Sequence, residues 1–226
     1  MKAYEINEFW DFVRENSEEE YRNFHSRLTR SNYPINGIRI PILRKYVKEI
    51  AKTKDVTEFL AQKPQCYEQC MLKGLLIKYL KLDDNDFFPL LERFIGEIDD
   101  WALNDVVCSD IRRKDDTYLE KVKQYAKREE IWFARWGIVA VMINFFDNDK
   151  VIYEIVDNLI ANDYYVDMAL AWLIQVLAVK NRWVAVTLMQ SDKVSEQVKK
   201  LALRKIKDSF RISKEDKEYF AQIIKT

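Results

Sequence analysis

Apolar residues recur at helical spacing in five segments of the chain, and the segments follow one another at nearly constant steps. They begin at Gln69, Trp101, Phe133, Val166 and Val198, so the steps are 32, 32, 33 and 32 residues. The segments read QCMLKGLLI, WALNDVVCS, FARWGIVAV, VDMALAWLI and VKKLALRKI. A repeat of this length is typical of stacked helix pairs, so the pattern predicts an all-α solenoid rather than one closed core.

Small residues stand inside four of these segments, where neighbouring helices must approach closely. They are Gly74, Gly137, Ala171 and Ala202. The positions that depart from the repeat pattern are the ones in which we look for chemistry.

The same periodicity predicts the remaining helices. A first helix is expected from Asn7 to Asn16, and Ser17 with Glu20 resembles a capping box that opens a second helix ending at Leu28. The stretch from Arg30 to Ile40 is rich in turn-forming residues and predicts a loop. Further helices are expected at residues 41–50, 56–62, 67–81, 85–98, 100–112, 116–128, 130–146, 149–161, 164–180, 182–191, 195–209 and 213–224.

Composition supports this interpretation. The 226 residues are 48% hydrophobic and 33% charged, with only 4 Gly and 4 Pro. So few helix-breaking residues favour long helices joined by short turns. No linker or shift in composition divides the chain, so we expect a single domain over residues 1–226.

No run of about 18 apolar residues is present, and the start MKAYEINEFWDF lacks the pattern of a signal peptide. We therefore expect a cytoplasmic protein without a membrane segment, and a monomer. Cys66 and Cys70 lie one helical turn apart, which allows either a metal site or two buried thiols. Two thiols rarely complete a zinc site, and the chain has a single histidine, so we expect no metal and no cofactor.

Charge is balanced overall but not along the chain. The 37 basic residues equal the 37 acidic ones, and a nucleic-acid-binding protein usually has a basic excess. Residues 1–20 hold seven acids and two bases, whereas residues 199–226 hold nine bases and four acids. This polarity permits either a local positive groove or ordinary solvated helix faces.

Four residues in three successive segments form the candidate site. Trp101 and Asp105 lie four residues apart on one helical face, and Arg135 and Trp172 lie in the next two segments. Each tryptophan could simply pack in the core. Asp105 stands among apolar residues, where a carboxylate must be paired or face a groove, so it is either half of a buried pair with Arg135 or a catalytic carboxylate.

Three stretches carry a resemblance to a known family. IDDWALNDVVCSDI, EIWFARWGIVAVMINFF and YYVDMALAWLIQVLAVK resemble the AlkD-like DNA alkylation-repair family, and the resemblance extends to GIRIPILRKYVKEIAK and SFRISKEDKE. It implies a right-handed α-solenoid of HEAT-like helix pairs with a concave groove. It also implies hydrolysis of the N-glycosidic bond of N3- or N7-alkylated purines in double-stranded DNA.

The resemblance implies roles for the four residues. Asp105 would be the catalytic carboxylate, Trp101 and Trp172 would flank the lesion-bearing nucleotide, and Arg135 would hold phosphate. The sequence departs from the family pattern at Ala102, where an aspartate is common, and near Leu28, where an aromatic residue is common.

Basic residues around these segments are candidates for the DNA backbone. They are Arg112, Arg113, Lys180, Lys199, Lys200 and Arg204. The alternative to an enzyme is a non-catalytic HEAT-like scaffold that binds nucleic acid or a protein partner, since function does not follow from a fold alone.

Overall fold

The computed structural model describes residues 1–223, and their packing divides into two compact units. Unit 1 comprises residues 1–111 and unit 2 begins at residue 112. Both units are helical, and each has its own apolar core. The expectation of a single domain over residues 1–226 stays a prediction.

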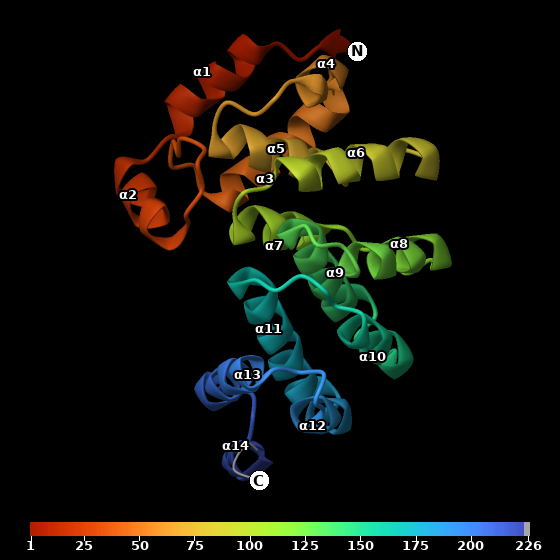
Figure 1. Cartoon of the computed structure of the whole chain (residues 1–226). Helices are drawn as coiled ribbons and strands as arrows, with labels where there is room; N and C mark the ends of the chain where they lie inside the picture. The colour runs from red at the N-terminus through yellow and green to blue at the C-terminus, as the bar shows by residue number, and fades with distance from the viewer. Residues whose placement is uncertain (224–226) are drawn as a thin grey trace. The chain divides into compact units, whose positions relative to one another are not determined.

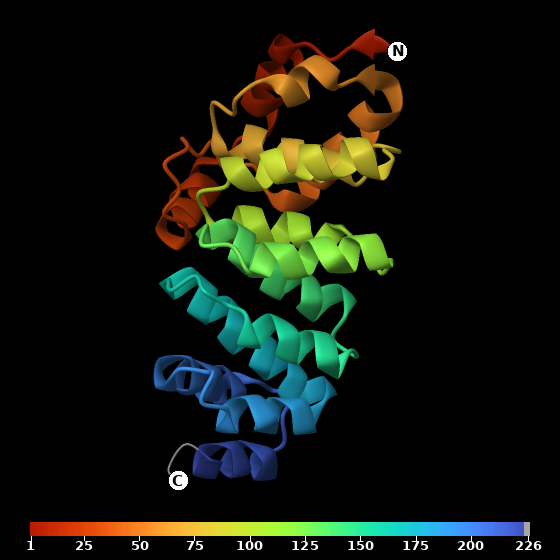
Figure 2. The ribbon, with the colours of Figure 1, turned by 45° about the vertical axis from the view of Figure 1, so that its right-hand side comes forward.

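Unit 1 contains seven helices and two very short strands among the described residues. The helices are α1 (Ile6–Asn16), α2 (Glu19–Leu28), α3 (Ile40–Thr53), α4 (Thr57–Ala61), α5 (Tyr67–Ile77), α6 (Asp84–Glu97) and α7 (Trp101–Asp110), as Figure 1 shows. α3 packs against α5, and α5 packs against both α6 and α7. Figure 2 shows α5 and α6 running side by side. The two-residue strands β1 (Lys2–Ala3) and β2 (Lys54–Asp55) pair in parallel.

Unit 2 continues the alternation of helices. Its described helices are α8 (Asp116–Ala126), α9 (Ile131–Asn144), α10 (Asp149–Asp157), α11 (Tyr164–Lys180), α12 (Arg182–Gln190), α13 (Glu196–Asp208) and α14 (Lys214–Ile223). α9 packs against α8, α10 and α11, and α11 packs in turn against α12 and α13. The repeat helices therefore contact one another in series, which is a solenoid-like arrangement within the unit.

The five repeat segments fall in α5, α7, α9, α11 and α13, so the prediction of an all-α fold of packed helix pairs is confirmed. The predicted hand and the concave groove involve both units and stay predictions. The last helix was expected to end at Ile224, which lies outside the described residues. α10 was expected to reach residue 161 but ends at Asp157, because the next residue, Asn158, leaves the helical conformation and its side chain bonds to the Glu154 carbonyl.

Side chains cap many of the helix starts. The carboxylate or hydroxyl oxygens of Asp83, Asp100, Asp115, Asp163 and Ser195 accept hydrogen bonds from backbone N–H groups in the first turns of their helices.

The capping box expected at Ser17 and Glu20 is wrong. α2 begins after Glu18, and the Ser17 hydroxyl instead donates to the Val13 carbonyl, 2.7 Å away, at the end of α1. Ser17 is therefore the residue that ends α1, because a hydroxyl can serve a free carbonyl as readily as a free N–H group.

Close helix contacts occur where two glycines leave room. A Cβ on Gly74 of α5 would lie 2.5 Å from the Phe94 ring and 2.6 Å from Val107. A Cβ on Gly137 of α9 would lie 2.7 Å from the Ala126 backbone nitrogen in α8. Each glycine therefore sets the spacing of a helix pair within its own unit.

Alanine in place of a closely packed helical glycine and alanine in place of an open one should have opposite effects on the free energy of unfolding. Gly137→Ala forces α8 and α9 apart and should lower the free energy of unfolding by about 1–3 kcal/mol. Gly96→Ala is the matched control in α6, because a Cβ there meets nothing within 4 Å. It should raise the stability by about 0.5–1 kcal/mol, since alanine favours the helix. Urea denaturation of both variants measures this, and equal effects would contradict it.

Candidate functional site

α7 presents the first half of the candidate site. Trp101 is its first residue and Asp105 follows one turn later on the same face. Asp105 is buried, with 8% of its surface exposed, between the fully buried Leu103 and Val107. Trp101 is partly exposed, and its indole Nε1 donates to the Leu28 carbonyl at the end of α2, 3.4 Å away.

A buried carboxylate fixes the start of α7. Asp100 is 0% exposed, and its Oδ1 accepts a 2.8 Å hydrogen bond from the Ala102 backbone N–H. Burial raises the pKa of the Asp100 carboxyl above its usual value, and the hydrogen bonds from backbone N–H groups partly oppose that shift. Trp101, the next residue, therefore starts from a fixed backbone position.

The neighbouring helix α2 combines exposed apolar residues with a buried histidine. Phe24 and Leu28, one turn apart, are 56% and 51% exposed. His25 is buried, and its ring meets the ring of Tyr67 edge-on at 4.6 Å between centroids. Apart from the missing aromatic residue near Leu28, no role was predicted for this helix face, because a short polar helix with alternating exposure has no distinctive sequence signature.

The second half of the candidate site lies in unit 2. Arg135 of α9 is 4% exposed, and its Nη1 donates to the Tyr165 carbonyl in the first turn of α11. Trp172 lies seven residues after Tyr165 on α11 and is partly exposed. Arg135 thus links α9 to α11, the helix that carries Trp172, through a charged donor.

The four predicted residues therefore form two pairs, one in each compact unit. Trp101 and Asp105 share α7, whereas Arg135 and Trp172 belong to the packed helices α9 and α11. Their convergence on one lesion, and the choice between a buried pair and a catalytic carboxylate for Asp105, stay predictions.

The candidate phosphate-binding residues differ in how available they are. Arg113 makes two 2.8 Å hydrogen bonds to Asp115, and Lys199 lies 2.9 Å from a Glu196 oxygen. The Lys180 ammonium lies 3.7 Å from the centre of the Phe146 ring. The remaining three, Arg112, Lys200 and Arg204, are exposed.

The three cysteines, Cys66, Cys70 and Cys108, are all buried. Burial raises the pKa of Cys66 to about 12 and raises that of Cys70 as well. Among residues 1–223, no group of three or more His, Cys, Asp or Glu side chains is arranged to hold a metal ion. Within the same residues, no helix is long and apolar enough to cross a membrane.

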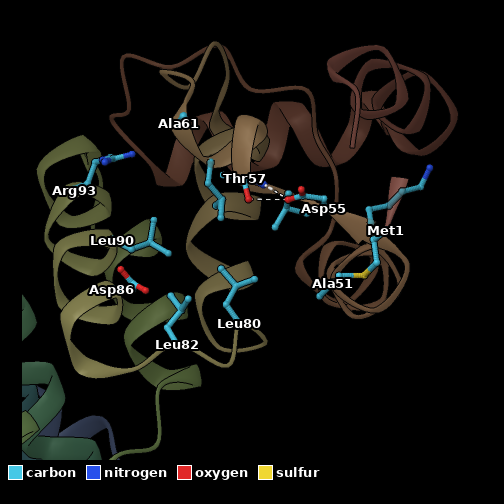
Figure 3. A pocket seen from close by; sticks show the side chains of 13 residues that line it. Met1, Ala51, Asp55, Thr57, Ala61, Leu80, Leu82, Asp86, Leu90 and Arg93 are labelled. Carbon is cyan, nitrogen blue, oxygen red and sulfur yellow. Dashed lines mark hydrogen bonds between the residues drawn. The ribbon is translucent and has the colours of Figure 1, made fainter. Parts of the chain in front are cut away.

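A pocket of about 340 Å³ lies elsewhere in unit 1, and Figure 3 shows it. Leu80 and Leu82 line it from the segment between α5 and α6, and Asp86, Leu90 and Arg93 line it from one face of α6. The predicted site residues are not part of its lining, so the pocket gives no support to the site derived from the sequence.

The only histidine of the chain offers a direct test of the packing beside Trp101. Burial lowers the pKa of His25, and Nδ1 of its ring has no hydrogen-bond partner. We expect the folded protein to titrate His25 below the unfolded value of about 6.5. Below that value the imidazole takes up a proton more readily in the unfolded chain than in the folded protein. The free energy of unfolding therefore decreases as pH falls below the unfolded pKa.

Proton NMR of the single imidazole measures this pKa directly, with the urea-unfolded chain as the reference. An equal or higher pKa in the folded protein would show that His25 is solvated or paired, contrary to the structure.

Comparison with known proteins places this geometry in context. A comparison with curated proteins gives no match. A family model described as DNA alkylation repair enzyme matches residues 8–206, a range that includes Trp101, Asp105, Arg135 and Trp172. The match covers most of the 226 residues and all five repeat segments. The chain therefore belongs to the DNA alkylation repair enzyme family.

Proposed function

We propose that this protein hydrolyses the N-glycosidic bond of N3- or N7-alkylated purines in duplex DNA, with Asp105 as the catalytic carboxylate. Membership of the family supports alkylation repair, and one observation supports the chemistry. Asp105 is a carboxylate with 8% exposure on an apolar helix, one turn after a partly exposed tryptophan. An acidic side chain is seldom buried among apolar residues, and functional sites are one of the places where such a side chain occurs.

The chemistry that this carboxylate must perform is modest. Alkylation at N3 or N7 makes the purine cationic, so the base leaves readily and the sugar gains positive charge. A carboxylate beside the sugar stabilises that charge, more strongly in a poorly solvated site than in water. Its oxygen can also accept a proton from the attacking water. Water is the only co-reactant that this reaction needs.

The two tryptophans would bind the damaged nucleotide. Trp101 and Trp172 both keep part of their indole exposed, one in each unit. An indole face attracts a cation, with a contribution of roughly 0.5–2 kcal/mol for each contact. A cationic alkylpurine nucleotide would therefore be favoured over an unmodified one.

Arg135 would hold the DNA backbone near the lesion. Its Nη1 donates to the Tyr165 carbonyl, and the planar fork of a guanidinium matches the geometry of a phosphate. Arg112, Lys200 and Arg204 are exposed and could add phosphate contacts. Arg113 and Lys199 would first have to leave their carboxylate partners.

A non-catalytic scaffold that binds nucleic acid or protein is the second candidate. The balanced charge of 37 basic and 37 acidic residues favours a protein partner for such a scaffold, because a surface that binds nucleic acid usually has a basic excess. Release of free base from alkylated DNA separates the two, because a scaffold releases none.

Replacement of the carboxylate should abolish excision without unfolding the protein. Asp105→Asn keeps the shape but removes the charge, so we expect the rate of 7-methylguanine release from methylated DNA to fall about 100-fold or more. Single-turnover assays that detect free base by chromatography measure this rate.

Asp110→Asn is the matched control on the same helix, because Asp110 is paired with Arg44 at 3.0 Å and has no proposed role in the reaction. It should keep near-normal activity. Equal release by wild type and Asp105→Asn would refute the assignment of Asp105.

The role of Arg135 can be separated from its contact with α11. Arg135→Gln keeps an N–H donor for the Tyr165 carbonyl and removes the charge. We expect weaker binding to duplex DNA. The slope of log K against log salt concentration should become smaller in magnitude, by about the amount that one phosphate contact contributes. Fluorescence anisotropy across a range of salt concentrations measures the slope. The control is Arg14→Ala, a change at an exposed arginine that is paired with Asp11, and it should leave the slope unchanged. An unaltered slope in Arg135→Gln would restrict Arg135 to a structural role.

A further inference from the structure

The chain between α2 and α3, residues 29–39, is held in place by three carboxylates from other parts of unit 1. We call these residues the connecting segment. Asp99, just before α7, accepts two of its hydrogen bonds: Oδ1 from the Ser31 hydroxyl at 2.7 Å and Oδ2 from the Asn32 N–H at 2.6 Å. Both are charge-assisted bonds, which are stronger than bonds between neutral groups.

Asp100 makes the second attachment. Its Oδ2 accepts from the Arg30 N–H at 3.4 Å, while its Oδ1 caps α7 through Ala102. The Tyr67 hydroxyl donates to the same Oδ1 at 3.5 Å. One buried side chain thus joins the connecting segment, α5 and the first turn of α7.

Glu68 of α5 makes the third attachment. It is 1% exposed, and its carboxylate accepts from the backbone N–H groups of Asn36, Gly37 and Ile38 at 3.0, 2.7 and 3.3 Å. The segment then returns to the start of α2, because the Gly37 carbonyl accepts from the Glu18 N–H at 3.0 Å. Gly37 has φ +90°, and a Cβ there would lie 2.5 Å from the Glu18 carbonyl oxygen, so only glycine fits.

These attachments fix both ends of α2. Leu28 is its last residue, and the carbonyl of such a residue has no partner within the helix. The indole Nε1 of Trp101 donates to this carbonyl. The orientation of the indole is therefore tied to α2, and α2 is tied to α5 and α7 through the carboxylates.

We infer that Asp99, Asp100 and Glu68 are positioning residues for Trp101, acting through the connecting segment and the Leu28 carbonyl. This inference rests on the proposed function, in which Trp101 binds the damaged nucleotide. The three carboxylates do not touch the substrate. They set the place of the indole that does, and a displacement of about 1 Å can slow a reaction about 100-fold.

A comparison within unit 1 separates positioning from ordinary helix capping. Asp83 precedes α6 as Asp100 precedes α7, and within residues 1–223 its carboxylate accepts from Asn85 and Asp86 of its own helix alone. Asp100 also caps its own helix through Ala102, but it accepts in addition from the Arg30 N–H, 70 positions away in the sequence. A purely structural cap has no need of such distant partners.

The test uses Asp99→Ala, because Asp99 is partly exposed and its loss should be tolerated, with Asp83→Ala as the matched control. The indole N–H resonance of Trp101, assigned through Trp101→Phe, is followed by NMR. In Asp99→Ala it should shift toward its position in the unfolded chain, and kcat for 7-methylguanine release should fall about tenfold, more than KM changes. Asp83→Ala should alter neither.

Ser31→Ala and Ser31→Thr form a second, milder pair. Alanine removes one bond to Asp99 and should cause part of the same shift, whereas threonine keeps the hydroxyl and should restore the wild-type resonance. An unchanged Trp101 resonance in Asp99→Ala, or a shifted resonance with unchanged kcat, overturns the inference. If the wild type releases no base, the proposed function fails, and the resonance alone then decides whether the carboxylates position Trp101.

Discussion

Two helix backbones can approach closely only where a side chain is missing between them, and this constraint underlies the packing of both units. Gly74 receives the Phe94 ring and Val107, and Gly137 receives the backbone of Ala126. Such contacts cannot be enlarged without moving a whole helix, because protein interiors are packed as densely as organic crystals. The spacing of the helix pairs, and hence the place of each side chain carried on them, follows from these positions.

Within that packing, several buried charged side chains are matched by backbone groups. Glu68 and Asp100 are almost fully buried, yet each accepts several N–H bonds that would otherwise be unmatched. Lys73 follows the same rule in α5, since its ammonium meets both the Gln62 carbonyl and Glu97 at 2.6 Å. Asp100 and Glu68 thus hold the part of unit 1 that contains α7, the helix of Trp101 and Asp105.

The sequence predicted the helices well because their periodicity is local. α11 begins and ends at the expected residues, and all five repeat segments lie in helices. Ser17 was misassigned because a hydroxyl can cap either helix end, and its choice depends on where α1 stops. The pairing of β1 with β2 and the partners of Glu68 join residues far apart in the sequence, so no local pattern discloses them. For the candidate site, the sequence predicted four residues, and their joint role stays a prediction; it did not predict that Arg135 would bond to the Tyr165 carbonyl.

The burial of all three thiols has a consequence for a protein of this family. Alkylating agents attack cysteine through its thiolate, and they reach only thiols that reagents can approach. Cys66, Cys70 and Cys108 are at most 1% exposed, and the raised pKa of Cys66 and Cys70 leaves those two sulfurs protonated at neutral pH. The electrophiles that alkylate DNA would therefore find no accessible thiolate at these three cysteines, so the protein is protected from inactivation through its thiols.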